Sequence, residues 1–167
     1  RCTFTVTVEA IPLIGATRYV AFGDSITEGK LPTGDLTPNS YPVVMKRELE
    51  ARYTSQTFTV FGEGGGGETT AGGVSRMRSV LDRDAPDVLL LLEGVNDLAG
   101  DGTAAIGPMI SNLRNMIQQA QGRGIRVFLG TLLPEIPGAQ RAGAAPFIVP
   151  ANDQIRGLAA STGATLV

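Results

Sequence analysis

The sequence predicts an α/β fold, in which helices cover a sheet of parallel strands. From residue 17 onward, short apolar runs typical of strands alternate with longer segments whose apolar residues recur at helical spacing. Such alternation is typical of parallel strands joined by right-handed helical crossovers. With 167 residues, 43% of them hydrophobic, the chain is long enough for one domain with a buried core.

Five apolar runs are the predicted strands. The run at 86–94, PDVLLLLEG, is almost continuously apolar, which indicates a central strand covered on both faces. The run at 57–62, TFTVFG, alternates between apolar and polar residues as a strand does. The other three are RYVAFG at 18–23, GIRVFLGT at 124–131 and ATLV at 164–167.

Four segments between these runs are the predicted helices. In residues 40–53, Ser40 suits the N-cap and Pro42 suits the first turn. Apolar residues recur at helical spacing in 72–83, and seven of them form one stripe over 106–120. The last helix is predicted over 150–162, with Ile155, Leu158 and Ala159 facing inward.

The first sixteen residues stand apart from this pattern. In residues 1–10, RCTFTVTVEA, the lone Cys2 and the apolar residues at 4, 6 and 8 fall on one face of a strand. This resembles the last strand of an immunoglobulin-like extracellular repeat, which implies the tail of a preceding module and a secreted protein. The alternative is a free thiol at the chain end. Residues 11–16 are interpreted as a linker and 17–167 as the main domain.

The composition excludes several classes of function. The net charge is only −2, charged residues make up 18%, and no basic stripe indicates a nucleic-acid partner. The longest apolar run, VLLLLEG, is too short to span a membrane. The aspartates at 82, 84 and 87 lie near a predicted helix–strand turn, and we interpret them as solvated charges rather than metal ligands. No metal or other cofactor is predicted.

Polar and glycine-rich segments follow four of the predicted strands. They are GDSITEG, GEGGGGETT, EGVNDLAG and TLLPEIPGAQRAGAAP, in chain order. In open parallel sheets, ligands bind beyond the carboxyl ends of the strands. Four such segments at one edge of the sheet therefore indicate a functional site there.

Three of these segments resemble the sequence blocks of the SGNH (GDSL-type) hydrolases, a family of esterases and lipases. The motifs GDS, GETT and GVND match in order, in spacing and in their placement after strands, and the resemblance runs from about residue 18 to the end. It implies a flavodoxin-like three-layer sandwich of about five strands in the order 2-1-3-4-5. It also implies that Ser25 is the nucleophile, and that the oxyanion is held by the backbone N–H groups of Ser25 and Gly67 and by the Asn96 side-chain amide.

The chemistry of ester hydrolysis explains these residue types. The reaction passes through a tetrahedral oxyanion, which fixed hydrogen-bond donors stabilise. Glycine allows close approach of the backbone, and asparagine offers a neutral N–H donor. Each residue also has a purely structural interpretation: Ser25 as a helix cap, the glycines as a loop, and Asn96 with Asp97 as a turn. Asp24 and Asp97 are interpreted as structural.

The sequence departs from the family pattern in its general base. The 167 residues contain no histidine. The fourth block of the family, D-x-x-H, supplies the base and normally follows the fifth strand, whereas this sequence ends at Val167. We therefore expect an incomplete last strand, an incomplete final helix and no activity from these residues alone, because an unassisted serine is a poor nucleophile. Glu28 and Lys30 are the nearest titratable substitutes in sequence.

Two functions stay open at this point. One is a hydrolase of acyl or acetyl esters of lipids or carbohydrates, and the other is a binding module that keeps the pocket without the base. GDSITEGKL is superficially similar to a phosphate-binding loop, but five residues rather than four separate its glycines, and a leucine follows Lys30. A flavodoxin-like electron carrier has only the fold in its favour, and fold does not set function.

Overall fold

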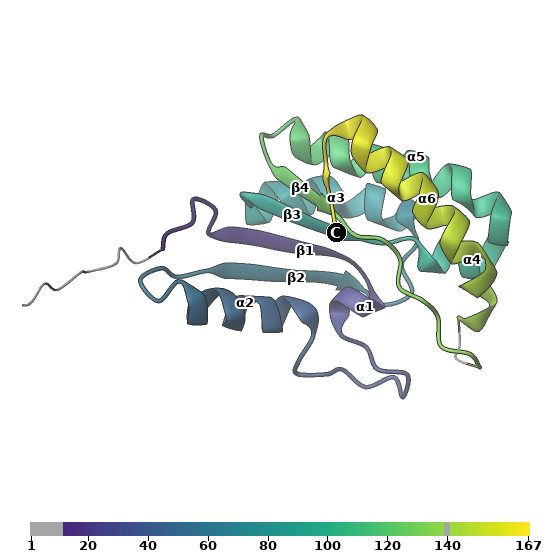
Figure 1. The fold of residues 1–167 in the computed structure, drawn as a ribbon, viewed down its shortest axis with the longest axis horizontal. Coiled ribbons are helices and arrows are strands. Elements are labelled where there is room, and N and C mark those ends of the chain that lie inside the picture. The colour runs from purple at the N-terminus through teal and green to yellow at the C-terminus, as the bar shows by residue number, and fades with distance from the viewer. Residues whose placement is uncertain (1–11, 139–140) are drawn as a thin grey trace, which may run out of the picture.

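A computed structural model describes residues 12–138 and 141–167 of the chain. Five strands form one sheet in the order β2-β1-β3-β4-β5, and every neighbouring pair is parallel (Figure 1). The predicted fold class and strand order are confirmed. The strands are β1 (Arg18–Asp24), β2 (Thr59–Gly65), β3 (Val88–Leu92), β4 (Arg126–Leu129) and β5 (Thr165–Leu166).

Helices cover both faces of the sheet (Figure 1). On one side lie α1 (Ser25–Glu28) and α2 (Tyr41–Arg52), and on the other lie α3 (Thr70–Asp84), α5 (Ile106–Gln121) and α6 (Ala145–Thr162). The short helix α4 (Val95–Asp101) follows β3. No helix in the described part of the chain is long and apolar enough to cross a bilayer.

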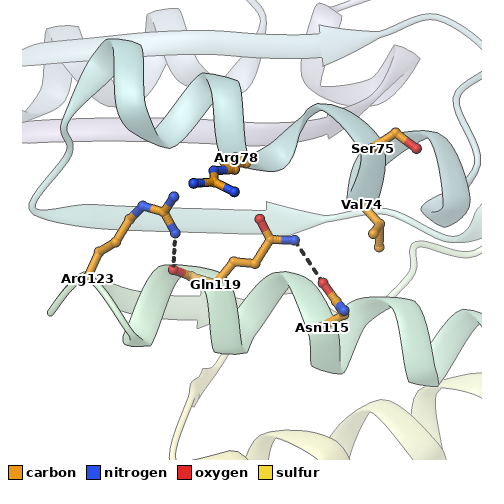
Figure 2. A pocket seen from close by; sticks show the side chains of 6 residues that line it. All are labelled: Val74, Ser75, Arg78, Asn115, Gln119 and Arg123. Carbon is orange, nitrogen blue, oxygen red and sulfur yellow. Dashed lines mark hydrogen bonds between the residues drawn. The ribbon is translucent and has the colours of Figure 1, made fainter.

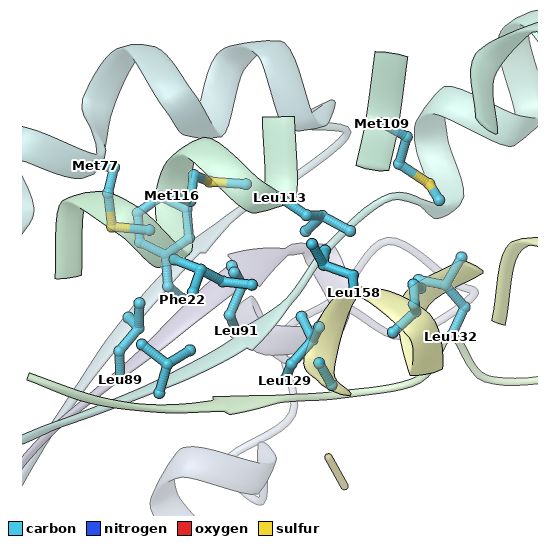
Figure 3. Packing of buried hydrophobic residues seen from close by; sticks show 14 of the residues in the cluster. Phe22, Met77, Leu89, Leu91, Met109, Leu113, Met116, Leu129, Leu132 and Leu158 are labelled. Carbon is cyan, nitrogen blue, oxygen red and sulfur yellow. The ribbon is translucent and has the colours of Figure 1, made fainter. Parts of the chain in front are cut away.

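The core lies mainly between the sheet and α3, α5 and α6. Alternate residues of β1 point to opposite faces, so Val20 and Phe22 enter this large cluster while Tyr19 enters a smaller one with α2. Figure 3 shows the larger cluster, where side chains from the strands meet those of the three helices. Its fully buried members include Phe22, Met77, Leu89, Leu91, Met109, Leu113, Met116, Ile117 and Leu129.

Two helices differ from the sequence prediction. The predicted start of α6 at Pro150 is wrong, because the helix begins at Ala145 with a proline already in its first turn. Pro150 lies inside the helix, where its missing N–H removes one backbone hydrogen bond. Burial of Ile148 against the core holds this extra turn in place. The second difference is α4, whose residues are not among the segments predicted as helices.

The three predicted solvated aspartates differ from one another. Asp82 is exposed as expected, with 55% of its side chain accessible. The prediction is wrong for Asp84, which is buried and contacts Arg83. Asp87 is exposed, as predicted, and its Oδ2 also accepts the backbone N–H groups of Thr17 and Arg18 at the start of β1, at 2.8 and 2.9 Å. These two hydrogen bonds lower the pKa of the Asp87 carboxyl.

The sheet register brings three polar segments to one edge. Asp24 at the end of β1 pairs with Gly65 of β2, and Gly23 pairs with Leu92 of β3. Part of the glycine run is therefore strand rather than loop. Gly64 is needed there because a Cβ atom would lie 2.1 Å from the backbone nitrogen of Glu28 in α1.

The predicted extracellular tail at residues 1–10, with Cys2, lies outside the described residues, so the domain boundaries stay a prediction. Within the predicted linker at 11–16, the Ile14 backbone exchanges two hydrogen bonds with the Gln56 side chain.

Candidate active site

Ser25 stands where β1 passes into α1. The preceding Asp24 is the N-cap of this single-turn helix, and its Oδ1 accepts the backbone N–H of Ile26 at 2.8 Å. Asp24 is 1% exposed, and burial raises the pKa of its carboxyl. The hydrogen bond agrees with the structural interpretation of Asp24, which orders the turn that carries Ser25.

Gly67 stands in the turn between β2 and α3. Its φ of +78° lies in the left-handed region, which side chains rarely adopt. A Cβ atom there would meet nothing within 4 Å. Backbone conformation is therefore what requires a glycine at this position, and not contact with a neighbouring group of the chain.

Asn96 lies in the first turn of α4 and links the other two segments. Its Nδ2 donates to the backbone carbonyl of Glu68 at 2.6 Å and to Asp24 Oδ2 at 3.3 Å. The next residue, Asp97, accepts the backbone N–H of Thr70 at 3.0 Å and its hydroxyl at 2.6 Å. These contacts agree with a structural role for Asp97, and they fasten the GVND segment to the GETT segment.

One cavity of about 310 Å³ joins the three predicted residues. Its lining consists of Ser25, Lys30, Gly66, Gly67, Asn96, Ala99 and Arg141. The sequence-predicted Ser25, Gly67 and Asn96 therefore meet at the carboxyl edge of the sheet, as the parallel topology requires. Each comes from the segment after a different strand.

Arg141 is the lining residue that sequence reasoning missed. It follows β4, 116 residues from Ser25, and its Nη2 donates a hydrogen bond to Ser25 Oγ. A guanidinium stays protonated and has no acceptor, so it cannot take the serine proton. Lys30 also lines the cavity but is exposed, and Glu28 is not among the lining residues.

A second group that the sequence did not reveal lies beside the cavity. Glu93, at the end of β3, is 1% exposed. Burial, and after it the neighbouring Glu68 carboxylate, raise the pKa of Glu93 to about 9. Arg76 of α3 contacts the Glu68 carboxylate at 2.6 Å. At neutral pH Glu93 is therefore a protonated, neutral carboxyl group.

A wider hollow of about 560 Å³ is lined by residues of α3 and α5 and by Arg123 (Figure 2). Several of its polar side chains have partners within the chain. Arg123 donates to the backbone carbonyl of Gln119 at 2.8 Å and contacts the Asp82 carboxylate at 2.9 Å, and the Gln119 side chain donates to Asn115 Oδ1 at 2.8 Å. None of the predicted site residues lines this hollow.

Fold and cavity together place the chain among parallel α/β proteins with a polar site at the carboxyl edge of the sheet. Within that class the chain belongs to the GDSL-like lipase/acylhydrolase family, whose sequence profile matches residues 21–167. A search among curated proteins finds no significant match.

Several solved structures resemble the chain over most of its length. AlinE4, an SGNH-hydrolase family esterase, is 28% identical with a TM-score of 0.68, over 93% of this chain and 77% of that one. A lipase/acylhydrolase from Enterococcus faecalis is 25% identical with a TM-score of 0.74, over 90% and 75%. The acetyl xylan esterase AlAXEase is 26% identical with a TM-score of 0.66, over 89% and 75%. The chain thus spans about three quarters of each of these proteins.

Proposed function

We propose that the chain carries the nucleophile and the oxyanion donors of a serine hydrolase that cleaves carboxylic esters. Ser25 Oγ attacks the ester carbonyl carbon as a base takes its proton, and the alcohol leaves with a proton. Water then releases the acid from the acyl-serine and restores the hydroxyl. The observation that carries the proposal is the single cavity shared by Ser25, Gly67 and Asn96.

The geometry around Asn96 supports its role as an oxyanion donor. Its amide nitrogen has two hydrogens, and the bond to the Glu68 carbonyl, at 2.6 Å, anchors the side chain. The contact with Asp24 is longer, at 3.3 Å, so the second hydrogen is held weakly. A developing oxyanion near Ser25 could take over that hydrogen, because the existing contact with Asp24 is long.

Activation of Ser25 requires a general base. The 167 residues contain no histidine that could serve as that base. We propose that these residues alone cleave esters no faster than a Ser25→Ala variant. The second candidate function is a binding module without a base. The absence of histidine favours it, and so does the hydrogen bond from Arg141 to Ser25 Oγ. The two candidates differ in whether the full-length natural protein acylates Ser25.

The proposed substrates are acyl or acetyl esters of lipids or carbohydrates. The names of the similar structures support this range, since one is a lipase/acylhydrolase and another an acetyl xylan esterase. Hydrolysis of acetylated sugars and of p-nitrophenyl esters of graded chain length would place the protein within the range.

A fluorophosphonate probe tests the proposal directly, because it phosphonylates activated serines. In the full-length natural protein, mass spectrometry should locate the adduct on Ser25, and the Ser25→Ala variant should stay unlabelled. Ser111→Ala is the matched control, since this serine of α5 is exposed and its hydroxyl donates to the backbone carbonyl of Gly107 in its own helix. Absence of labelling at Ser25 would favour the binding module.

A further inference from the structure

Arg76, Glu68 and Glu93 meet beside the cavity, and we call them the Arg76 cluster. The Arg76 guanidinium stacks on the ring of Phe22, with 3.8 Å between its central carbon and the ring centroid. Its Nε lies 2.8 Å from both carboxylate oxygens of Glu68, and its Nη2 lies 2.6 Å from Oε2. The stacking and the paired hydrogen bonds fix the guanidinium in one orientation.

The same guanidinium also binds the main chain of two strands. Arg76 Nη2 donates to the carbonyl of Glu63 in β2 at 2.8 Å and to that of Gly23 in β1 at 3.2 Å. Gly23 lies two residues before Ser25 in the chain. Arg76 therefore ties the ends of both strands to the segment that contains Glu68.

Glu68 in turn fixes the positions of Gly67 and Asn96. Glu68 follows Gly67 directly, and its carbonyl accepts the 2.6 Å hydrogen bond from Asn96. A displacement of Glu68 therefore moves the Gly67 backbone and removes the anchor of the Asn96 amide.

Glu93 completes the cluster from β3. Among the described residues, neither of its carboxyl oxygens has a hydrogen-bond partner. A Cβ atom on Gly73 of α3 would lie 2.2 Å from Oε2, so the carboxyl group fits only because that residue is a glycine. The charged groups that face Glu93 are Glu68, Arg76 and Asp24. Arg76 already contacts the carboxylates of Glu68 and Glu63 and two backbone carbonyls, so the facing group that could accept a hydrogen bond from neutral Glu93 is the Glu68 carboxylate.

We propose that Arg76 and Glu93 are positioning residues, which act through Glu68 to hold Gly67 and Asn96 in place as oxyanion donors. The inference rests on the proposed function, because it takes Gly67 and Asn96 as those donors. Protonated Glu93 adds no charge beside Glu68 and can donate to it, whereas ionised Glu93 places a second negative charge beside the Glu68 carboxylate. Arg76 cannot neutralise both carboxylates, so Glu68 shifts and the two donors lose their positions.

Carbon-detected NMR of the 167-residue chain tests this coupling without any catalysis. Burial and Glu68 raise the pKa of Glu93 to about 9. Between pH 6 and 10, the Glu93 carboxyl carbon should titrate with a midpoint near that value. The side-chain carbonyl carbon of Asn96 and the Cα of Gly67 should shift with the same midpoint. In Glu93→Gln, which stays neutral and still donates, both shifts should disappear.

A second pair of variants tests Arg76 at constant pH. Arg76→Lys keeps the charge but loses the paired hydrogen bonds, and it should shift the Asn96 and Gly67 resonances at pH 7. Arg78→Lys, on the same helix with 81% of its side chain exposed, should leave them unchanged. Equal effects of the two variants would remove Arg76 from the proposal.

The wild-type titration decides the proposal even where a variant does not fold. Titration of Glu93 with no matching change at Asn96 and Gly67 would overturn it. Persistence of their shifts in Glu93→Gln would overturn it as well. These measurements do not involve ester cleavage. The coupling of Glu93 to Asn96 and Gly67 can therefore fail while Ser25 is still acylated, and acylation of Ser25 can fail while the coupling is observed.

Discussion

The buried Glu93 should make the protein less stable as the pH rises from 6 to 8. In the folded chain its pKa is about 9, against an ordinary value of 4.5. Within this window the folded state holds a proton that the unfolded state releases. The free energy of unfolding should then fall with pH, by at most about 1.4 kcal/mol per unit. Two units give an upper limit of about 3 kcal/mol, or a midpoint lower by about 5–10 °C.

The pH window is favourable because few other groups titrate in it. The chain contains no histidine, the side chain whose ordinary pKa falls there. The pKa of Asp87 is lowered, so its contribution to stability is lost only as the pH falls into the acid range. Burial raises the pKa of Asp24, which contributes with the same sign as Glu93. The Glu93→Gln variant separates these two groups.

Thermal unfolding followed by circular dichroism at pH 6, 7 and 8 measures the slope. Wild type should lose stability across the series, and Glu93→Gln should lose little or none. Glu48→Gln is the control, because this glutamate is 67% exposed and should leave the slope unchanged. A flat wild-type profile, or the same slope in Glu93→Gln, would refute the assignment of a buried neutral carboxyl.

Three further substitutions have expected outcomes. Asn96→Ala in the full-length natural protein should lower kcat about 100- to 1,000-fold with little change in KM, because one oxyanion donor is lost; steady-state kinetics would reject this if KM alone rose. Gly67→Ala should destabilise the fold by about 1–2 kcal/mol, since its φ of +78° disfavours a Cβ, and urea unfolding indistinguishable from wild type would contradict it. Leu113→Ala removes a fully buried side chain and should cost about 2–5 kcal/mol in the same assay, whereas a smaller loss would mean that the core closes over the space.

Much of the fold could be predicted because each strand and helix has its own periodicity. The continuous apolar run of β3 indicated a central strand, and the apolar stripe of α5 indicated its buried face, which includes Leu113 and Met116. The start of α6 was missed because prolines favour helix starts, and Pro150 gave a plausible one. Helix α4 was missed because it is short and buries only Val95 and Leu98.

The cavity could be predicted only in part, because some of its residues belong to recognisable sequence motifs and others do not. Ser25, Gly67 and Asn96 each follow a strand, and parallel strands bring such positions to one edge. Arg141 lies in the fourth polar segment expected at this edge, but nothing in that segment singles it out, and its contact with Ser25 spans 116 residues. Arg76 lies within a helix and Glu93 at a strand end, where a charged residue is ordinarily solvated. Only the tertiary structure shows that Glu93 is buried and that Arg76 contacts the Glu68 carboxylate.

Ester turnover by the full-length natural protein tests the role of Ser25 most directly. With p-nitrophenyl acetate as the substrate, Ser25→Ala should reduce kcat/KM by several orders of magnitude, because only substrate binding and the oxyanion donors remain. The 167-residue chain should match its own Ser25→Ala variant. Near-normal turnover by the full-length Ser25→Ala protein would contradict the account, as would Ser25-dependent turnover by the 167 residues alone.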